Sequence, residues 1–174
     1  MPDANDPHAV RPWTPLDFRI GLGEDTHRLG PGGPLRLGGI DLPGEVHAIG
    51  HSDADVLLHA LVDALLGGIH AGDIGRLFPD TAEENRGRDS REFVAEAVRR
   101  ITAAGWMVVN LDCVVQTEVP KIAPVAEPIC AAIGAMLGIP AERVSVKGKT
   151  GEGVGPIGRR EAIAARVVAL LSRS

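Results

Sequence analysis

A mixed α/β domain of the α+β type is the fold class that the sequence predicts, and three observations support it. Apolar residues recur with the helical period from Val56 to Leu65, and with the two-residue strand period from Trp106 to Thr117. Clusters of glycine and proline separate such runs along the chain. The 174 residues, 44% hydrophobic and 24% charged, are enough for one globular domain with a substantial core.

The first expected strand runs from Phe18 to Gly23. Proline and glycine at residues 31–34 then predict a turn, and Leu35 to Leu37 predicts a hairpin or a short extended connection. Because this strand is expected to end at Gly23, Asp25 and His27 should lie just beyond it.

The apolar run from Val56 to Leu65 predicts a capped helix. Ser52 is the expected N-cap, with Asp55 as a weaker partner than glutamate in a capping box. Gly67 and Gly68 are expected to close the helix.

The remaining elements alternate in type. A second helix is expected to begin at Ser90 and to end at Gly105 in the left-handed C′ position. A half-buried strand from Trp106 to Thr117, a helix from Ala126 to Leu137 and a strand from Arg143 to Lys147 follow. The tail, residues 161–171, is rich in alanine and leucine, so helical propensity and a closing-strand position leave both states open.

Composition excludes several classes of protein. Residues 1–17 are acidic and proline-containing, so we expect a disordered extension before a single domain at 18–174. No apolar run reaches transmembrane length, so no membrane partner is expected. A net charge of −5, without a basic block and with 3% aromatic residues, argues against nucleic acid. Two separated cysteines, Cys113 and Cys130, fit a reducing, cytoplasmic setting.

Asp25 and His27 are candidate metal ligands, because residues two apart on an extended segment point the same way. Alone, this pair is read more simply as a solvated turn. His59 on the first helix is a third candidate, although a lone histidine there would be read as a core residue. Together the three would form a nitrogen and oxygen site with one open position, the pattern of catalytic zinc.

Neighbouring residues suggest supporting roles. Asp55 and Asp63 flank His59 at i−4 and i+4, which suggests that they hydrogen-bond its second ring nitrogen. His51 and Ser52 precede the helix N-terminus, where an anion is favoured; an ordinary N-cap with an incidental histidine is the competing interpretation.

Two loops carry further candidates. Residues 71–75 and 78–81 combine carboxylates with small residues that allow a ligand close to the backbone, or serve as turns. The loop from Lys147 to Gly153 has two lysines and is suited to phosphate. It is no Walker A segment, because position 143 is Arg where the first glycine is required.

Several of these segments, in this order, resemble the 2-C-methyl-D-erythritol 2,4-cyclodiphosphate synthase family of the non-mevalonate (MEP) isoprenoid pathway. The resemblance runs from about Phe18 to Leu171, and two of its motifs are highly specific, HSDADVLLHAL and GDIGRLFPDT. The others are GLGEDTHRL, LGGIDLP, the Pro120-Lys121 turn and VKGKTGEGVGPIGRREAIA.

The resemblance implies a mixed β-sheet with helices packed on one face, assembled as a homotrimer around a threefold axis. It implies a cytoplasmic lyase that converts a cytidine diphosphate derivative of methylerythritol 2-phosphate into a cyclic diphosphate plus CMP. The substrate's own 2-phosphate attacks the β-phosphorus, so no protein nucleophile is required.

The resemblance also implies residue roles. Asp25, His27 and His59 would hold Zn²⁺, and Glu152 would support Mg²⁺ or Mn²⁺. His51 and Thr150 would stabilise the transition state. The implied substrate-binding residues are Ser52, Asp73, Ile74, Gly75, Phe78, Pro79, Asp80, Thr81 and Ala82. The implied nucleotide-binding residues, supplied by the adjacent subunit, are Thr117, Glu118, Val119, Pro120, Lys121, Ile122, Ala123, Lys149, Thr150, Gly151, Glu152 and Arg159.

The sequence departs from the family at the residues that line a cavity on the trimer axis. Glu24 and Pro156 stand where many members have phenylalanine or another apolar residue. Because desolvated charges persist only when paired, we expect Glu24 to pair with Arg159 near the axis. Arg160 and Ala162 replace common glycines and suggest a bulkier interface.

Two other functions compete with this interpretation. A zinc-dependent phosphohydrolase could use the same ligands, but the chain lacks the HExxH motif that would supply a general base. A non-catalytic trimeric relative would be expected to have lost ligands, and none is missing.

Overall fold

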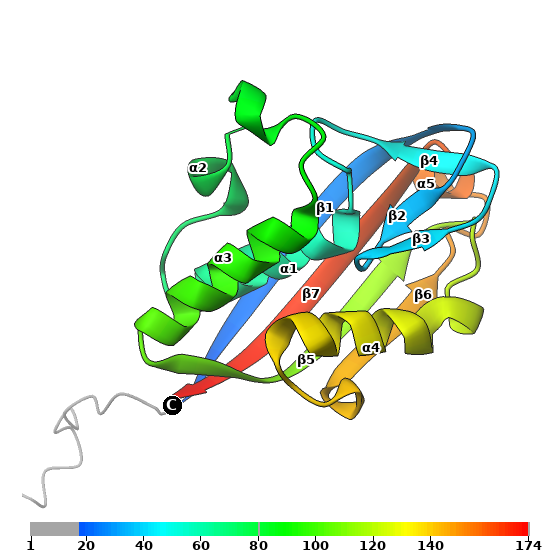
Figure 1. The fold of residues 1–174 in the computed structure, drawn as a ribbon. Coiled ribbons are helices and arrows are strands. Elements are labelled where there is room, and N and C mark those ends of the chain that lie inside the picture. Colours follow the sequence, from blue (N-terminus) through cyan, green and yellow to red (C-terminus); the bar gives the residue numbers. More distant parts are fainter. Residues whose placement is uncertain (1–17, 80, 174) are drawn as a thin grey trace, which may run out of the picture.

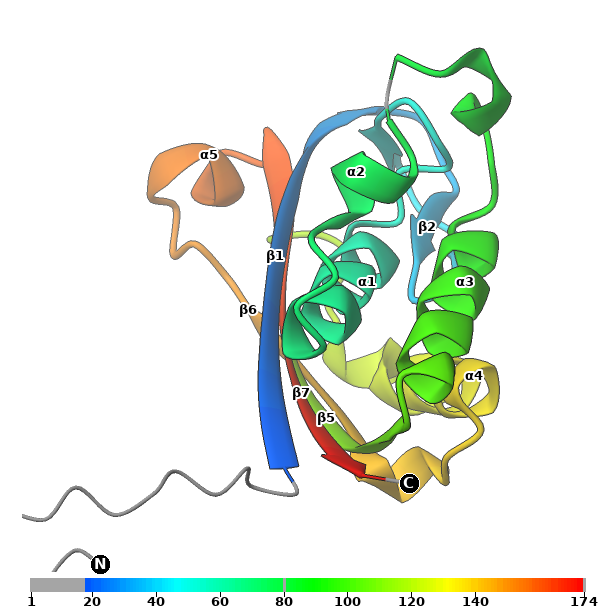
Figure 2. The same ribbon diagram turned by 90° about the vertical axis from the view of Figure 1, so that its left-hand side faces the viewer.

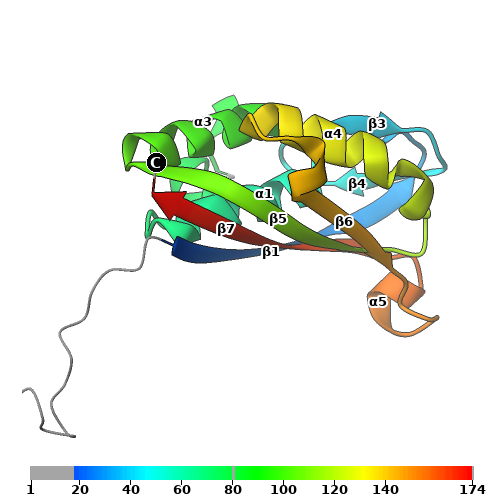
Figure 3. The same cartoon turned by 90° about the horizontal axis from the view of Figure 1, so that it is seen from below.

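The computed structural model describes residues 18–79 and 81–173, so the expected N-terminal extension at 1–17 lies outside the described residues. Helices α1, α3 and α4 cover one face of a β-sheet, and among the described residues only the short α5 lies on the opposite side, near one end of the sheet (Figures 1, 2 and 3). The predicted mixed α/β fold is confirmed.

A five-stranded sheet has the order β4-β1-β7-β5-β6, and only the β5–β6 pair is parallel. A separate hairpin joins β2 and β3. The strands are β1 (Phe18–Pro31), β2 (Leu35–Leu37), β3 (Ile40–Leu42), β4 (Val46–Ile49), β5 (Trp106–Gln116), β6 (Val144–Lys149) and β7 (Ala162–Arg173).

Strand β1 is longer than the sequence predicted. It continues past Gly23 to Pro31, because β7 pairs with it from Phe18 to Arg28 and β4 pairs with its last four residues. Asp25 and His27 therefore lie inside a strand, and the expectation that they follow a strand end was wrong.

The tail of the chain is a strand, not a helix. β7 lies between β1 and β5 in the sheet, and most of its residues are buried. Hydrogen bonding on both sides fixes this state, which the helical propensity of alanine and leucine opposes.

The helices are α1 (Val56–Gly68), α2 (Ile74–Leu77), α3 (Ser90–Ala103), α4 (Ala126–Leu137) and α5 (Gly155–Gly158). Short 3₁₀ turns cover Glu83–Asn85, Ala123–Val125 and Ala141–Arg143. None of the described helices combines the length and the hydropathy needed to cross a membrane.

Asp55, not Ser52, caps α1. The Asp55 carboxylate accepts hydrogen bonds from the amide of Leu58 at 3.0 Å and from the amides of Gly38 and Gly39 at 2.9 and 2.7 Å. It is fully buried, and this burial raises its pKa although the three N–H groups oppose the shift. One side chain thus starts the helix and fixes the β2–β3 turn against it.

Helix α1 lies unusually close to β1. A Cβ atom on Gly21 would stand 1.8 Å from the carbonyl oxygen of Ala64, and one on Gly23 would stand 1.9 Å from that of Ala60. Only glycine leaves room for this approach. The next residues on the same face of β1 are Asp25 and His27, which are therefore held beside α1.

The opposite face of the sheet is apolar and exposed, with Phe18, Ile20, Leu22, Met107 and Val168 at its surface. Among these residues Glu24 pairs with Arg166, with Oε1 and Nη2 2.9 Å apart. Arg159 pairs instead with Glu161, so the expected Glu24–Arg159 pair does not form within one chain, and such a pair between subunits at the trimer axis stays a prediction. The reason is register, because β1 places Glu24 directly opposite Arg166 on β7.

Candidate metal centre and substrate pockets

Three candidate ligand atoms form an equilateral triangle between β1 and α1. Asp25 Oδ2, His27 Nε2 and His59 Nδ1 are each 3.0 Å from the other two. Strand periodicity aims the first two side chains at the helix, and the glycine contact at Gly23 brings His59 to meet them. Within the described ranges, no other group of three or more His, Cys, Asp or Glu residues gathers its ligand atoms so closely.

The triangle fits a divalent metal. Two imidazole nitrogens and one carboxylate oxygen are donors that zinc accepts, and three protein ligands leave a position open. Tetrahedral bonds of about 2.0–2.1 Å imply ligand separations of roughly 3.3–3.4 Å, a few tenths of an ångström wider than the triangle. An ion would therefore need only a small expansion of side chains that already converge.

The electrostatics of the triangle favour a charged ligand set. Burial opposes ionisation of Asp25, but the hydrogen bond from His27 and the close contacts with both imidazole rings outweigh it, so the pKa of Asp25 is lowered. The carboxylate is thus available to a cation across the pH range of a cell.

The expected hydrogen bonds from His59 to Asp55 and Asp63 are wrong. Asp55 caps α1, and Asp63 Oδ1 accepts from the amide of Ile74 at 2.7 Å, which anchors α2. His59 Nε2 instead contacts the hydroxyls of Ser52 at 3.0 Å and Ser90 at 2.8 Å. Asp55 and Asp63 lie one helical turn before and after His59 along the axis of α1, whereas the ring of His59 extends sideways from the helix towards α3.

A pocket of about 220 Å³, the histidine pocket, opens beside the triangle. It is lined by His27, His51, Ser52, His59, Ile74, Phe78, Asn85 and Phe93. Of the predicted substrate residues, Ser52, Ile74 and Phe78 line it together with the predicted catalytic His51.

The other predicted substrate residues lie beside the histidine pocket or outside the described ranges. Asp73 caps α2 and bonds the amide of Arg76 at 2.9 Å, and the carbonyl of Pro79 accepts from Asn85. Gly75, Thr81 and Ala82 are not among the lining residues, and Asp80 lies outside the described residues.

A second pocket of about 160 Å³, the loop pocket, lies where β5 and β6 end. It is lined by Thr117, Lys121, Ile122, Ala123, Gly148, Lys149 and Thr150, and all but Gly148 were predicted nucleotide-binding residues. Glu118 accepts from the amide of Gly151 at 2.8 Å, and Thr150 donates to the exposed carboxylate of Glu152. Arg159 does not line this pocket.

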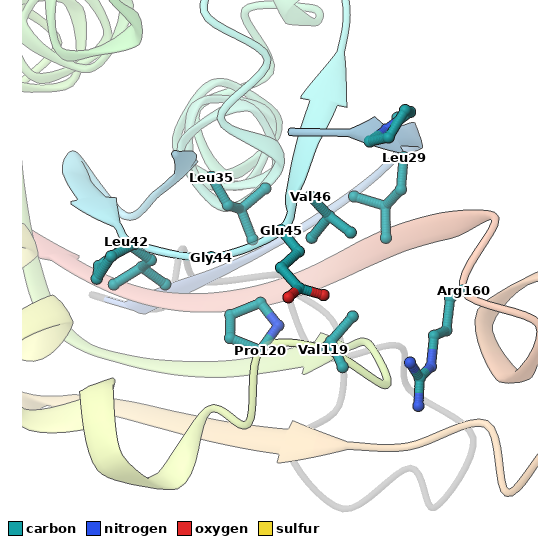
Figure 4. Close-up of a pocket in the computed structure, with 12 residues that line it drawn as sticks. Leu29, Leu35, Leu42, Gly44, Glu45, Val46, Val119, Pro120 and Arg160 are labelled. Atoms are coloured by element: carbon teal, nitrogen blue, oxygen red, sulfur yellow. The ribbon is translucent and has the colours of Figure 1, made fainter. Parts of the chain in front are cut away.

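Val119 and Pro120 line a different and larger cavity of about 440 Å³, the hairpin cavity (Figure 4). Leu29, Leu35, Leu42 and Val46 form its apolar wall, and Glu45 and Arg160 add opposite charges. The predicted nucleotide segment from Thr117 to Ala123 is therefore divided between two cavities.

The histidine and loop pockets lie at one level of the sheet but far apart along it. Asp25 on β1 pairs with Ala165 on β7, which pairs with Val115 on β5, which pairs with Gly148 on β6. Three strand spacings of about 4.8 Å each separate the Asp25 and Gly148 backbones by roughly 14 Å. The predicted catalytic residues His51 and Thr150 thus belong to separate pockets of one chain.

Sequence reasoning missed three residues around the histidine pocket. Phe93 stacks on Phe78 with ring centroids 4.3 Å apart, although its spacing on α3 indicated only a core residue. Ser90 was predicted only as the start of a helix, and Asn85 ends a short 3₁₀ turn in a segment without apolar periodicity. No local pattern marks these positions, because their roles depend on contacts with distant segments.

Comparison with known proteins agrees with the fold and with the family resemblance of the sequence. Residues 18–172 match the model of the YgbB family. A 2-C-methyl-D-erythritol 2,4-cyclodiphosphate synthase of Rhodopirellula baltica is 62% identical over 91% of this chain and 96% of its own length. The corresponding protein of Bordetella avium is 51% identical over 91% of this chain and 98% of its own.

Solved structures give the same result. A CDP-bound 2C-methyl-D-erythritol-2,4-cyclodiphosphate synthase has a TM-score of 0.82 at 40% identity, covering 88% of this chain and 100% of its own. The CDP complex of IspF from Plasmodium falciparum has a TM-score of 0.81 at 34% identity, covering 92% and 99%. The chain therefore belongs to the YgbB family.

Proposed function

We propose that the chain converts 4-diphosphocytidyl-2-C-methyl-D-erythritol 2-phosphate into 2-C-methyl-D-erythritol 2,4-cyclodiphosphate and CMP. The observation that carries this proposal is the triangle of Asp25, His27 and His59 beside the histidine pocket, in a chain 62% identical to a protein with this name. The CDP-bound relatives support a cytidine diphosphate substrate.

Two cations support the reaction. Asp25, His27 and His59 would hold zinc, which when bound supplies a Lewis acid and a template for a phosphate oxygen. Glu152 would help to hold Mg²⁺ or Mn²⁺, because its carboxylate is exposed on the glycine-rich loop and hard cations take oxygen ligands.

The side chains of the chain bind the substrate and stabilise developing charge. His51 and Ser52 line the histidine pocket and would bind the phosphorylated diol, with Ile74 and Phe78 against its carbon skeleton. Lys149 and Thr150 line the loop pocket and would hold the cytidine diphosphate part. His51 and Thr150 act where charge grows on the transferring phosphoryl group.

The active site forms between subunits of a homotrimer. Roughly 14 Å of sheet separates the two pockets within one chain. The exposed face with Phe18, Ile20 and Leu22 is the kind of apolar surface that a second subunit covers. The histidine pocket of one subunit would then meet the loop pocket of its neighbour, and the Glu24–Arg166 pairs would come close to the axis, where many family members have apolar residues.

One assay tests this function against its competitors. The purified protein is incubated with the cytidylyl substrate, zinc and magnesium, and the products are separated and identified by mass and phosphorus NMR. CMP together with a cyclic diphosphate is the expected result. CMP with a linear product would replace the proposal with a phosphohydrolase, and no turnover would favour a non-catalytic relative.

A further inference from the structure

His59 contacts a serine–aspartate pair, in which the serine is buried and the aspartate half-buried, that has no part in the proposed reaction. Ser90, the first residue of α3, is fully buried, and its Oγ lies 2.8 Å from His59 Nε2. The same hydroxyl bonds Asp53 Oδ1 at 2.5 Å, and the amide of Ser90 bonds Asp53 Oδ2 at 2.9 Å. Residues 37 apart in sequence thus meet behind the metal triangle.

The direction of each hydrogen bond follows from the groups involved. An ionised carboxylate only accepts hydrogen bonds, and Asp53 faces the amide and hydroxyl of Ser90 with its two oxygens while Arg36 Nε lies 3.7 Å from Oδ2. Ser90 therefore donates its single hydroxyl proton to Asp53. Its oxygen can then only accept from His59, so the proton of the His59 ring is on Nε2.

We propose that Ser90 and Asp53 are positioning residues that fix this tautomer of His59. With the proton on Nε2, the lone pair of Nδ1 points at Asp25 and His27 and is ready for a metal ion. The inference rests on the proposed zinc site and adds what prepares that site in the free protein.

The same arrangement leaves the proton of Ser52 for the substrate. Ser52 Oγ lies 3.0 Å from the same Nε2, which has one proton and already donates to Ser90. Neither this contact nor the one with Ala54 uses the hydroxyl proton of Ser52, because the Ser52 oxygen faces the protonated Nε2 and accepts from the amide of Ala54 at 3.4 Å. Ser52 lines the histidine pocket and can donate there to a phosphate oxygen.

The pair is anchored from outside the site. Arg36 on β2 lies 2.9 Å from Asp41 and 3.2 Å from Asp89, the N-cap of α3, besides facing Asp53. Its Nε is buried without a hydrogen bond, so the guanidinium faces Asp53 as a charge. The β2–β3 hairpin, α3 and the metal-binding helix are thereby tied together.

Zinc affinity of the full-length protein tests the proposal, measured by competition with a chromogenic chelator. Ser90→Ala removes the acceptor and should weaken zinc binding about 10- to 100-fold. Asp53→Asn should weaken it at least as much. The side-chain oxygen of the new asparagine must accept from the backbone N–H of Ser90, so its NH₂ group faces the Ser90 hydroxyl and donates to it. The Ser90 hydroxyl then donates its own proton to His59 Nε2, which reverses the hydrogen bond between them. The matched control, Ser52→Ala, should keep zinc affinity within about twofold while raising KM for the substrate.

A spectroscopic readout separates tautomer control from general structural damage. Nitrogen-15 chemical shifts of His59 in the metal-free protein should show Nε2–H in the wild type and a shift toward Nδ1–H in Asp53→Asn, with unchanged thermal unfolding. An unchanged tautomer in Asp53→Asn, or wild-type zinc affinity in a folded Ser90→Ala, would overturn the inference. A wild type that binds zinc but releases no CMP would instead refute the proposed function and leave this inference standing.

Discussion

The histidine pocket and the loop pocket stand at one level of the same sheet, but one chain completes them to different degrees. The metal triangle draws on β1 and α1, and contacts from α3 fix the ring of His59. The loop pocket has no comparable convergence: Lys149 and Glu152 are exposed, and the Glu152 carboxylate bonds only its neighbour Thr150. A single chain thus brings the three candidate metal ligands together but leaves the predicted nucleotide-binding residues open to solvent.

The histidine pocket and the loop pocket should therefore have different requirements. Under the proposed function, tight metal binding would depend on packing inside one subunit, whereas turnover would depend on a second subunit as well. Variants at the two pockets should therefore fail in different ways.

Loss of the helical ligand should have the largest effect. His59→Ala removes one corner of the triangle, so we expect zinc to be lost and kcat/KM to fall by at least about 1,000-fold. Metal content and turnover measure this, and His70→Ala, at an exposed histidine outside both pockets, is the matched control. A zinc-loaded, active His59→Ala protein would remove His59 from the ligand set.

Packing of α1 on β1 should come next. In Gly23→Ala the new Cβ would stand 1.9 Å from the carbonyl oxygen of Ala60. The helix must move, so we expect zinc binding to weaken and the free energy of unfolding to drop by about 1–3 kcal/mol.

Gly67→Ala serves as the control on the same helix, because its Cβ has no neighbour closer than 3.9 Å. It should stabilise the fold slightly, by about 0.5–1 kcal/mol. Equal unfolding curves for Gly23→Ala and the wild type would contradict the close-packing argument.

A change at the loop pocket should spare the metal. Thr150→Ala should lower kcat about 10- to 100-fold through lost charge stabilisation, while zinc affinity and KM stay close to the wild-type values. Steady-state kinetics beside a zinc titration measures both. A change confined to KM would argue for substrate binding instead of a role in the transition state.

The smallest expected effect is a difference in reactivity between the two cysteine thiols, which reports on the sheet that both pockets share. Burial raises the pKa of the Cys113 thiol to about 12, whereas Cys130 is only partly buried. If the solvent-exposed region of the loop pocket does not extend into β5, iodoacetamide at pH 8 should label Cys130 faster than Cys113. Peptide mass spectrometry with a guanidinium-unfolded control measures this, and faster labelling of Cys113 would indicate that β5 opens.

Local periodicity predicted the elements and the ligand set better than it predicted the surroundings of the ligands. The i, i+2 spacing aligned Asp25 with His27 although the strand end was misplaced, because alternation holds wherever the backbone is extended. The tail stayed undecided, because β7 is fixed by two neighbouring strands that its own residues do not reveal.

Contacts between distant residues set the limit of this reasoning. Helix spacing suggested Asp55 and Asp63 as partners of His59, but the hydroxyls of Ser52 and Ser90 contact its outer ring nitrogen, and Asp53 accepts from Ser90. Glu24 pairs with Arg166, 142 residues away, because the register of β1 and β7 places the two residues opposite each other. Such pairs depend on the topology, which no window of sequence contains.

Mixing two impaired variants tests most directly whether the two pockets of one chain serve different active sites. His59→Ala and Thr150→Ala proteins are unfolded together in equal amounts, refolded with zinc and magnesium, and assayed for CMP and cyclic diphosphate. If each site joins the histidine pocket of one subunit to the loop pocket of the next, random assembly restores intact sites at about one in four, and activity returns to roughly a quarter of wild type. Activity that stays at the average of the two separate variants would contradict the account.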